Sequence, residues 1–187
     1  GLLGQMMEPV AFYENAEIKL SDASNKPWAA TGHGNKRKHN IINSLYLQAA
    51  ELEEKVRARF ERYEQVKANE TMAEFYKTED AEIVVVAYGS TARLAKSAVE
   101  LARKEGIKAG VFRPITLWPY PVKEITEACK NAKKALTGER SMGQMVDDVK
   151  LALNCRIPVE FFGRTGGVIP GPAEILNKIK EMIGGDK

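Results

Sequence analysis

A turn near the middle of the chain carries the residues best placed to bind an anion. Gly89, Ser90 and Thr91 follow the apolar run "VVVAY", and Arg93 lies within the first turn of the helical pattern that comes next. In an open parallel sheet, ligands meet the carboxyl ends of the strands, where helix N-termini present free backbone N–H groups. A phosphate or another anion is therefore physically able to bind at this turn.

The sequence signature of a nucleotide site is absent from the same turn. The chain contains neither GxGxxG nor GxxxxGK[ST], and no acidic residue is placed to contact a ribose. The alternative is that Gly89 makes the turn and that Ser90 or Thr91 caps the following helix. The sequence favours this alternative, and we expect no dinucleotide site.

Two more positions carry side chains that could take part in a site. Glu139 ends a short predicted strand, and its carboxylate could face a partner chain or interact with the N-terminus of the next helix. Arg164 lies in "GRTGGVIPGP", a loop whose glycines and prolines predict a fixed shape. That loop suits contact with another chain as well as it suits ligand binding.

No constellation for catalysis or metal binding is visible. His33 and His39 have no neighbouring Cys, Asp or Glu at ligand spacing. Cys129 and Cys155 form no CxxC pair and supply too few thiolates for an iron–sulfur cluster. We find no Ser–His–Asp, Cys–His or paired-carboxylate arrangement. The sequence thus predicts no catalytic, cofactor-binding or metal-binding residue in this chain.

The composition excludes several classes of protein. Of the 187 residues, 44% are hydrophobic and 28% are charged, which is typical of a globular protein with one domain and an appendage. The net charge of +3 is too small to indicate a nucleic-acid partner. No signal peptide is visible in the sequence, and no apolar stretch is long enough to span a membrane. Because the cysteines are few and far apart, we expect a cytoplasmic location.

The elements that must position these residues alternate between strand and helix from residue 80 onward. This order predicts a mostly parallel sheet between two layers of helices, an α/β three-layer sandwich. Strands are expected within residues 81–89, 107–121, 133–139 and 156–163, and helices at 91–106, 122–132, 141–154 and 171–185. Gly106 is expected to end the first of these helices.

The residues before the domain predict a linker and a long helix. Residues 1–46 include the basic cluster "NKRKHN" and are expected to be a linker together with the tail of a preceding domain. Residues 47–79 are expected to form an amphipathic helical arm, helical to residue 76, with Glu51–Lys55 and Glu53–Arg57 as supporting pairs. Its narrow apolar stripe suits packing on another domain or subunit. The stripe consists of Leu52, Val56, Phe60, Tyr63 and Val66.

Several segments resemble known families. The stretch "DAEIVVVAYGSTARLAKSAVELARKEGIKAGVFRPITLWPYP" resembles the start of the C-terminal domain of transketolase-type thiamine diphosphate enzymes. In the right order, "GLLGQMMEPV", "KRKHNIINSLYL", "FRPITLWPYP", "SMGQMVDDVKLAL" and "FFGRTGGVIP" resemble the alpha subunit of 2-oxoacid:ferredoxin oxidoreductases. The likeness is strongest to the branched-chain (2-oxoisovalerate) type, followed by the 2-oxoglutarate type.

This resemblance implies a reaction and a set of partners. The family decarboxylates a 2-oxoacid oxidatively with coenzyme A and gives acyl-CoA, carbon dioxide and reduced ferredoxin. Thiamine diphosphate, magnesium and the iron–sulfur clusters are expected on other chains or domains, and the beta, gamma and ferredoxin-like subunits are expected partners. The first domain of the alpha subunit supplies an activating glutamate. By resemblance the present chain begins at the tail of that domain, so we expect it to serve assembly and to be inactive alone.

One departure and two alternatives accompany the resemblance. Where the family has a hydrophobic residue, Glu and Met, this chain has Gly138, Glu139 and Arg140. Gly138 is expected to shorten the strand, and Arg140 puts a charge at an apolar position. One alternative is the C-terminal domain of another thiamine enzyme, such as a transketolase or a synthase. The other is a stand-alone regulatory domain that binds an anion at Ser90 and Thr91.

Overall fold

The computed structural model describes residues 26, 28–29 and 32–184. The chain divides into two units, and the division falls between Glu61 and Arg62, within the helix α2 (Ala49–Asn69). The predictions for the opening segment "GLLGQMMEPV" lie outside the described residues.

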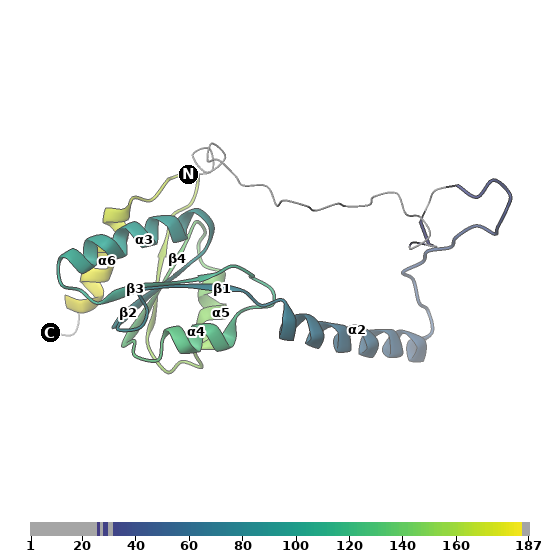
Figure 1. Ribbon diagram of the computed structural model, residues 1–187, viewed down its shortest axis with the longest axis horizontal. Coiled ribbons are helices and arrows are strands. Elements are labelled where there is room, and N and C mark those ends of the chain that lie inside the picture. The colour runs from purple at the N-terminus through teal and green to yellow at the C-terminus, as the bar shows by residue number, and fades with distance from the viewer. Residues whose placement is uncertain (1–25, 27, 30–31, 185–187) are drawn as a thin grey trace, which may run out of the picture. The chain divides into compact units, whose positions relative to one another are not determined.

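The unit that contains residues from Arg62 onward is built on a five-stranded sheet (Figure 1), and its strand order is β1-β3-β2-β4-β5. The strands are β1 (Ala73–Tyr76), β2 (Ile83–Ala87), β3 (Ala109–Pro114), β4 (Lys134–Glu139) and β5 (Val159–Gly163). Strands β2 to β5 are parallel, whereas β1 lies antiparallel to β3 at the edge. The predicted α/β class with a mostly parallel sheet is therefore confirmed.

Helices cover both faces of the sheet, as Figure 1 shows. The helices are α3 (Gly89–Lys104), α4 (Val122–Ala128), α5 (Met145–Ala152) and α6 (Pro172–Gly184). Helices α3 and α6 enclose one apolar core and α4 and α5 enclose the other. All five residues of β2 are buried because this central strand faces both cores, which explains its continuous apolar run.

The end of α3 follows the sequence prediction. Gly106 has a positive φ of 81°, a backbone conformation that glycine adopts without a steric penalty. The N–H of Ile107 donates to the Ala102 carbonyl at 3.0 Å, and that of Gly106 donates to the Arg103 carbonyl at 3.0 Å. These bonds satisfy the last carbonyls of the helix, so Gly106 is confirmed as its C-terminal glycine.

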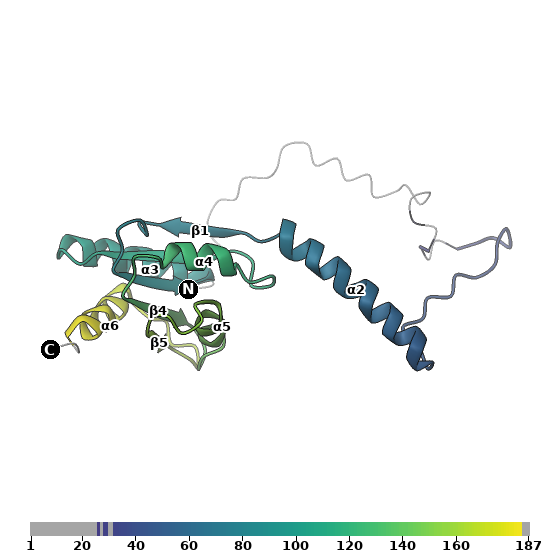
Figure 2. The same cartoon turned by 90° about the horizontal axis from the view of Figure 1, so that it is seen from below.

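The predicted long helix was wrong beyond Asn69. Helix α2 ends there, where the Thr71 hydroxyl donates to the Lys67 carbonyl at 2.9 Å. Residues Ala73–Tyr76 instead form β1 at the sheet edge (Figure 2) and pair with Val111–Pro114 of β3. The pairing supplies backbone hydrogen bonds from a distant segment, which a local apolar pattern cannot reveal. The sheet therefore takes in residues that we had expected in the arm.

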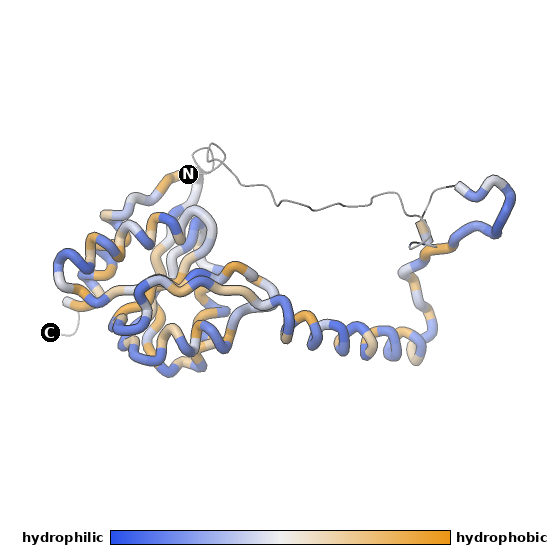
Figure 3. The backbone as a smooth tube through the Cα atoms, in the orientation of Figure 1, coloured by the Kyte–Doolittle hydropathy of each residue, from blue (hydrophilic) through white to orange (hydrophobic). Residues whose placement is uncertain are grey.

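The surface of α2 is predominantly polar, with isolated apolar positions (Figure 3). None of its residues is buried, and Leu52 and Phe60 are 41% and 57% exposed. The expected pair of Glu53 and Arg57 is present with an N–O distance of 2.7 Å. Near the end of the helix, the Tyr63 ring packs edge-on against Trp118 at 5.2 Å between ring centroids.

Candidate functional site

The candidate residues gather at the carboxyl edge of the sheet. Strands β2 and β4 are adjacent and pair Ala87 with Gly138, and β4 and β5 pair Glu139 with Gly163. The turn at Gly89, the Glu139 carboxylate and Arg164 therefore follow three neighbouring strand ends. Between β2 and β4 the order of strands reverses, and such a switch point is where open α/β sheets bind ligands.

The turn after β2 differs from the prediction in how it begins the helix. Helix α3 starts at Gly89, whose φ is +55°, and its N-cap is Tyr88, which makes no side-chain capping bond. Capping by Ser90 or Thr91 was therefore a wrong prediction. Both residues lie inside the first turn, because the left-handed conformation of Gly89 carries the chain directly from the strand into the helix.

Thr91 has a packing role in this turn. Its side chain is 3% exposed, and a Cβ added to Gly138 would lie 3.2 Å from its Cγ2 atom. The methyl group of Thr91 thus occupies the space left by the absent side chain of Gly138. Thr91 is therefore turned toward the sheet, where it is inaccessible to a ligand in solvent. Arg93, in contrast, is exposed on the same helix.

Gly138 does not shorten its strand, contrary to our expectation. Strand β4 continues through Gly138, which pairs with Ala87 on one side and Phe162 on the other, and ends at Glu139. A glycine is tolerated because backbone pairing on both sides holds the strand while Thr91 fills the missing volume. The Arg140 side chain is exposed, so its charge remains in water at no burial cost.

Glu139 is a buried carboxylate that caps α5. It is 1% exposed and accepts backbone N–H bonds from Gln144 at 3.0 Å, Met145 at 3.1 Å and Val146 at 2.9 Å. The Ser141 hydroxyl also donates to it at 3.0 Å. Backbone donors and the helix dipole together stabilise a negative charge at a helix N-terminus. Of the two alternatives for Glu139, the structure shows the interaction with the next helix.

Arg164 and Glu174 hold the loop between β5 and α6. The Arg164 guanidinium forms an ion pair with the Glu174 carboxylate. The backbone N–H of Arg164 donates to the Glu139 carbonyl at 3.2 Å. The Gly171 N–H donates to Glu174 at 2.9 Å. This backbone bond, together with Arg164, lowers the pKa of the Glu174 carboxyl. The loop is thus fixed by pairs within the chain.

The two cysteine thiols, which are the remaining reactive groups, lie away from this edge. Burial raises the pKa of the Cys129 thiol to about 12, which keeps it protonated and unreactive near neutral pH. Cys155 is exposed and free. Within the part of the chain that the structure describes, no group of three or more His, Cys, Asp or Glu residues is arranged to hold a metal ion. None of the described helices is long and apolar enough to cross a bilayer.

A pocket that the sequence did not predict lies at the opposite, amino edge of the sheet. The pocket has a volume of 330 Å³, and its walls include Ile83, Lys133 and Met182. Its residues come from four separate segments, and the only local signal was the lysine pair at the start of β4.

Comparison with known proteins identifies the family. The family model of the pyruvate:ferredoxin oxidoreductase core domain II matches residues 81–175. The ketoisovalerate oxidoreductase subunit VorB of Methanothermobacter marburgensis is 44% identical over 183 residues, which cover 98% of this chain and 51% of the relative. The 2-oxoglutarate synthase subunit KorA of the same organism is 42% identical over 105 residues, which cover 56% of this chain and 28% of that relative. The chain spans about half the length of the VorB relative.

Solved structures share the fold. A 2-oxoglutarate:ferredoxin oxidoreductase from Magnetococcus marinus, with 2-oxoglutarate, coenzyme A and succinyl-CoA bound, aligns with a TM-score of 0.67 at 24% identity, over 83% of this chain and 28% of that one. A split gene transketolase in an inactive beta4 tetramer aligns with a TM-score of 0.51 at 19% identity. The alignment covers 59% of this chain and 40% of the transketolase chain. Because the family model matches residues 81–175 and the VorB relative is 44% identical over 98% of the chain, the chain belongs to the 2-oxoacid:ferredoxin oxidoreductase family and contains its core domain II.

Proposed function

We propose that the chain is part of the alpha subunit of a thiamine diphosphate-dependent oxidoreductase that converts a branched-chain 2-oxoacid and coenzyme A to acyl-CoA. The observation that carries the substrate class is the extent of similarity. Identity to the ketoisovalerate subunit continues over 98% of the chain, whereas identity to the 2-oxoglutarate subunit covers 56%. The similarity to the ketoisovalerate subunit therefore includes the linker and the arm in addition to the sheet.

Within that enzyme, we propose that this part of the subunit serves assembly. The polar candidates Glu139 and Arg164 are engaged within the chain, where they fix a helix start and a loop. The beta, gamma and ferredoxin-like subunits are the proposed partners, with ferredoxin and coenzyme A acting at the level of the complex. In the proposed organisation, residues 1–46 are a linker, α2 (Ala49–Asn69) is the arm, and the α/β domain includes β1 from Ala73 onward.

The residues present do not fit an iron–sulfur cluster, so we assign the clusters, thiamine diphosphate and magnesium to other chains or domains. A cluster needs deprotonated thiols, and burial holds the Cys129 thiol protonated. Cys155 is exposed, and the two cysteines of the chain supply fewer thiolates than the four that a cluster usually needs. Free cysteines also fit the proposed cytoplasmic location.

The substrate class is tested on the intact enzyme. The complex is isolated through the polypeptide that carries this chain, and viologen reduction is compared with 2-oxoisovalerate, 2-oxoglutarate and pyruvate, each with coenzyme A. We expect the highest kcat/KM with 2-oxoisovalerate. Faster reduction with 2-oxoglutarate would favour the second candidate, a 2-oxoglutarate:ferredoxin oxidoreductase. The 42% identity to the 2-oxoglutarate subunit supports this candidate.

A stand-alone regulatory domain that binds an anion is the alternative from another functional class. It is supported by the position of Gly89 and Ser90 at the switch point of the sheet. A melting-temperature titration with phosphate, ATP, NAD and coenzyme A separates the two possibilities. Selective stabilisation by one compound, abolished in the Ser90→Ala, Arg93→Gln variant, would support the regulatory domain.

A further inference from the structure

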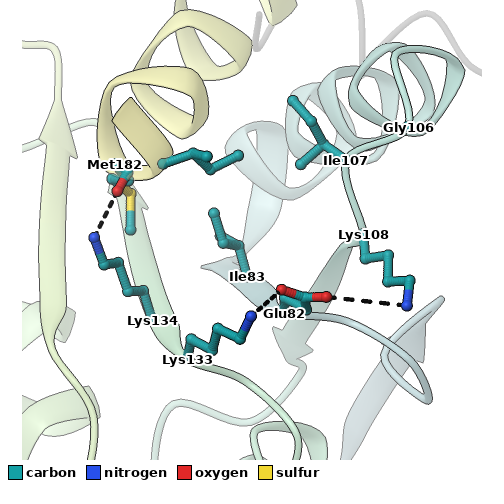
Figure 4. A pocket seen from close by; sticks show the side chains of 9 residues that line it. Glu82, Ile83, Gly106, Ile107, Lys108, Lys133, Lys134 and Met182 are labelled. Atoms are coloured by element: carbon teal, nitrogen blue, oxygen red, sulfur yellow. Dashed lines mark hydrogen bonds and ion pairs between the residues drawn. The ribbon is translucent and has the colours of Figure 1, made fainter. Parts of the chain in front are cut away.

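The pocket at the amino edge of the sheet has one apolar side. Ile83 begins β2 and is 4% exposed, and Met182 lies across from it near the end of α6 (Figure 4). Ile107 and Ile183 complete this side. None of the lining residues is aromatic, so the pocket offers no stacking surface for a nucleobase. An aliphatic group is the chemical class that such a wall accommodates.

The other side of the pocket is charged, with an excess of cations. Lys133 lies 2.5 Å from the Glu82 carboxylate, and Lys108 lies 3.9 Å from the same group (Figure 4). The Lys134 ammonium donates to the Met182 carbonyl at 2.5 Å. Two ammonium groups, those of Lys108 and Lys133, thus face a single carboxylate, and the local field attracts an anion.

The ion pairs with Glu82 are readily exchanged for pairs with a ligand. The side chains of Lys133, Lys108 and Glu82 are 74%, 57% and 44% exposed. Exposed pairs of this kind contribute little to stability, because water screens them and ordering the side chains costs entropy. A second carboxylate can therefore be shared by Lys108 and Lys133 at small energetic cost.

We propose that this pocket binds a small aliphatic carboxylate. The carboxylate lies between Lys108 and Lys133, and the alkyl chain lies against Ile83, Ile107 and Met182. The volume of 330 Å³ is at the small end for ligand sites, which limits the ligand to a short chain. The pocket is lined by the starts of β2 and β4 with the residues before them, by residues 106–108 before β3 and by the end of α6. The inference is therefore independent of the proposed function.

The test is a titration of the full chain with hexanoate, acetate and inorganic phosphate, followed by backbone amide NMR shifts. We expect hexanoate to shift amides at residues 82–83, 106–108, 133–134 and 182–183 in the millimolar range. Acetate should bind about tenfold more weakly, because it lacks the methylene groups that the apolar side buries. Phosphate should bind more weakly than hexanoate, because it has no alkyl chain to bury against the apolar side.

Variants separate the two sides of the pocket. Lys108→Gln with Lys133→Gln should weaken hexanoate binding about tenfold, since it removes both charges that hold the carboxylate. Lys130→Gln is the matched control, because Lys130 also forms a 2.5 Å ion pair with a glutamate but lies outside the pocket. Ile183→Ser should reduce the preference for hexanoate over acetate.

Three results would overturn the proposal. They are the absence of hexanoate shifts at these amides, equal binding of phosphate, and affinity unchanged in the double lysine variant. All the altered side chains are exposed, and the amide spectrum reports whether each variant retains its fold.

Discussion

At the scale of single residues, Glu139 determines the local structure of the carboxyl edge. Its buried carboxylate accepts several backbone N–H groups that α5 would otherwise leave unsatisfied. An internal carboxyl group therefore occupies the position at which other α/β proteins bind a phosphate. Glu139, for which the sequence left open a partner contact or an interaction with the next helix, is a structural cap.

Replacing Glu139 with Gln should destabilise the chain by about 1–3 kcal/mol, because the amide turns a donor toward backbone donors and leaves them unpaired. The measurement is urea unfolding followed by circular dichroism. Glu181→Gln, at an exposed position of α6, should change the free energy of unfolding by less than about 0.5 kcal/mol. Equal stability of the two variants would contradict the capping role.

At the scale of elements, β1 is attached to α3 by charges as well as by its strand pairing. Hydrogen bonding by Lys96, supported by Arg113, lowers the pKa of the Glu74 carboxyl. Hydrogen bonds from Lys77 and Tyr76 lower the pKa of Glu100 on α3 in the same way. Each ionised carboxylate thus favours the folded edge of the sheet.

The free energy of unfolding should therefore depend on pH below about 4.5, the ordinary pKa of glutamate. Because both folded pKa values are lowered, the stabilisation is complete above this pH and is lost as the pH falls through the lowered values. Urea unfolding across this range measures it. Glu74→Gln and Lys96→Gln should each make the decline shallower, and an unchanged slope in both variants would exclude the pair as its source.

The end of the arm should depend on the contact between Tyr63 and Trp118. A helix with so few apolar residues owes its stability to packing. Tyr63→Ser should accelerate amide exchange over residues 62–69 and leave the sheet protected. Tyr46→Ser, which removes a ring beside Lys55 instead, is the control. Exchange that is already fast in the unmodified chain would show that the contact does not hold the helix.

The elements with a strong local pattern were predicted from the sequence, and those specified by distant partners were not. The apolar run of β2 and the periodic helix ending at Gly106 appear as expected. Strand β1 was missed because its four residues become a strand only through pairing with β3. Helix α5 begins at Met145, later than predicted, because the Glu139 carboxylate selects the N–H groups that start it.

The same distinction applies to the candidate site. The sequence placed Gly89, Glu139 and Arg164 at or after the ends of predicted strands, and the structure shows that these strands are neighbours. It did not give the roles of Ser90 and Thr91, which depend on the conformation of Gly89 and on the space beside Gly138. Three-dimensional packing decides both.

At the scale of the whole molecule, the chain is a folded α/β domain with an arm whose apolar positions are partly exposed. Leu52 and Phe60 on α2, and Leu117 and Trp118 in the loop before α4, each expose between 41% and 57% of their surface. Apolar groups of this kind suit burial against other parts of an enzyme. Glu139 and Arg164 at the carboxyl edge, in contrast, bind partners within the chain. Both features agree with the proposed role in assembly.

The central claim is that this chain supports catalysis without performing it. The direct measurement is viologen reduction by the purified chain with thiamine diphosphate, magnesium, coenzyme A and 2-oxoisovalerate, beside the intact complex that carries the same sequence. The account predicts dye reduction by the complex and none by the chain alone. Reduction by the isolated chain that depends on 2-oxoisovalerate and coenzyme A would contradict it.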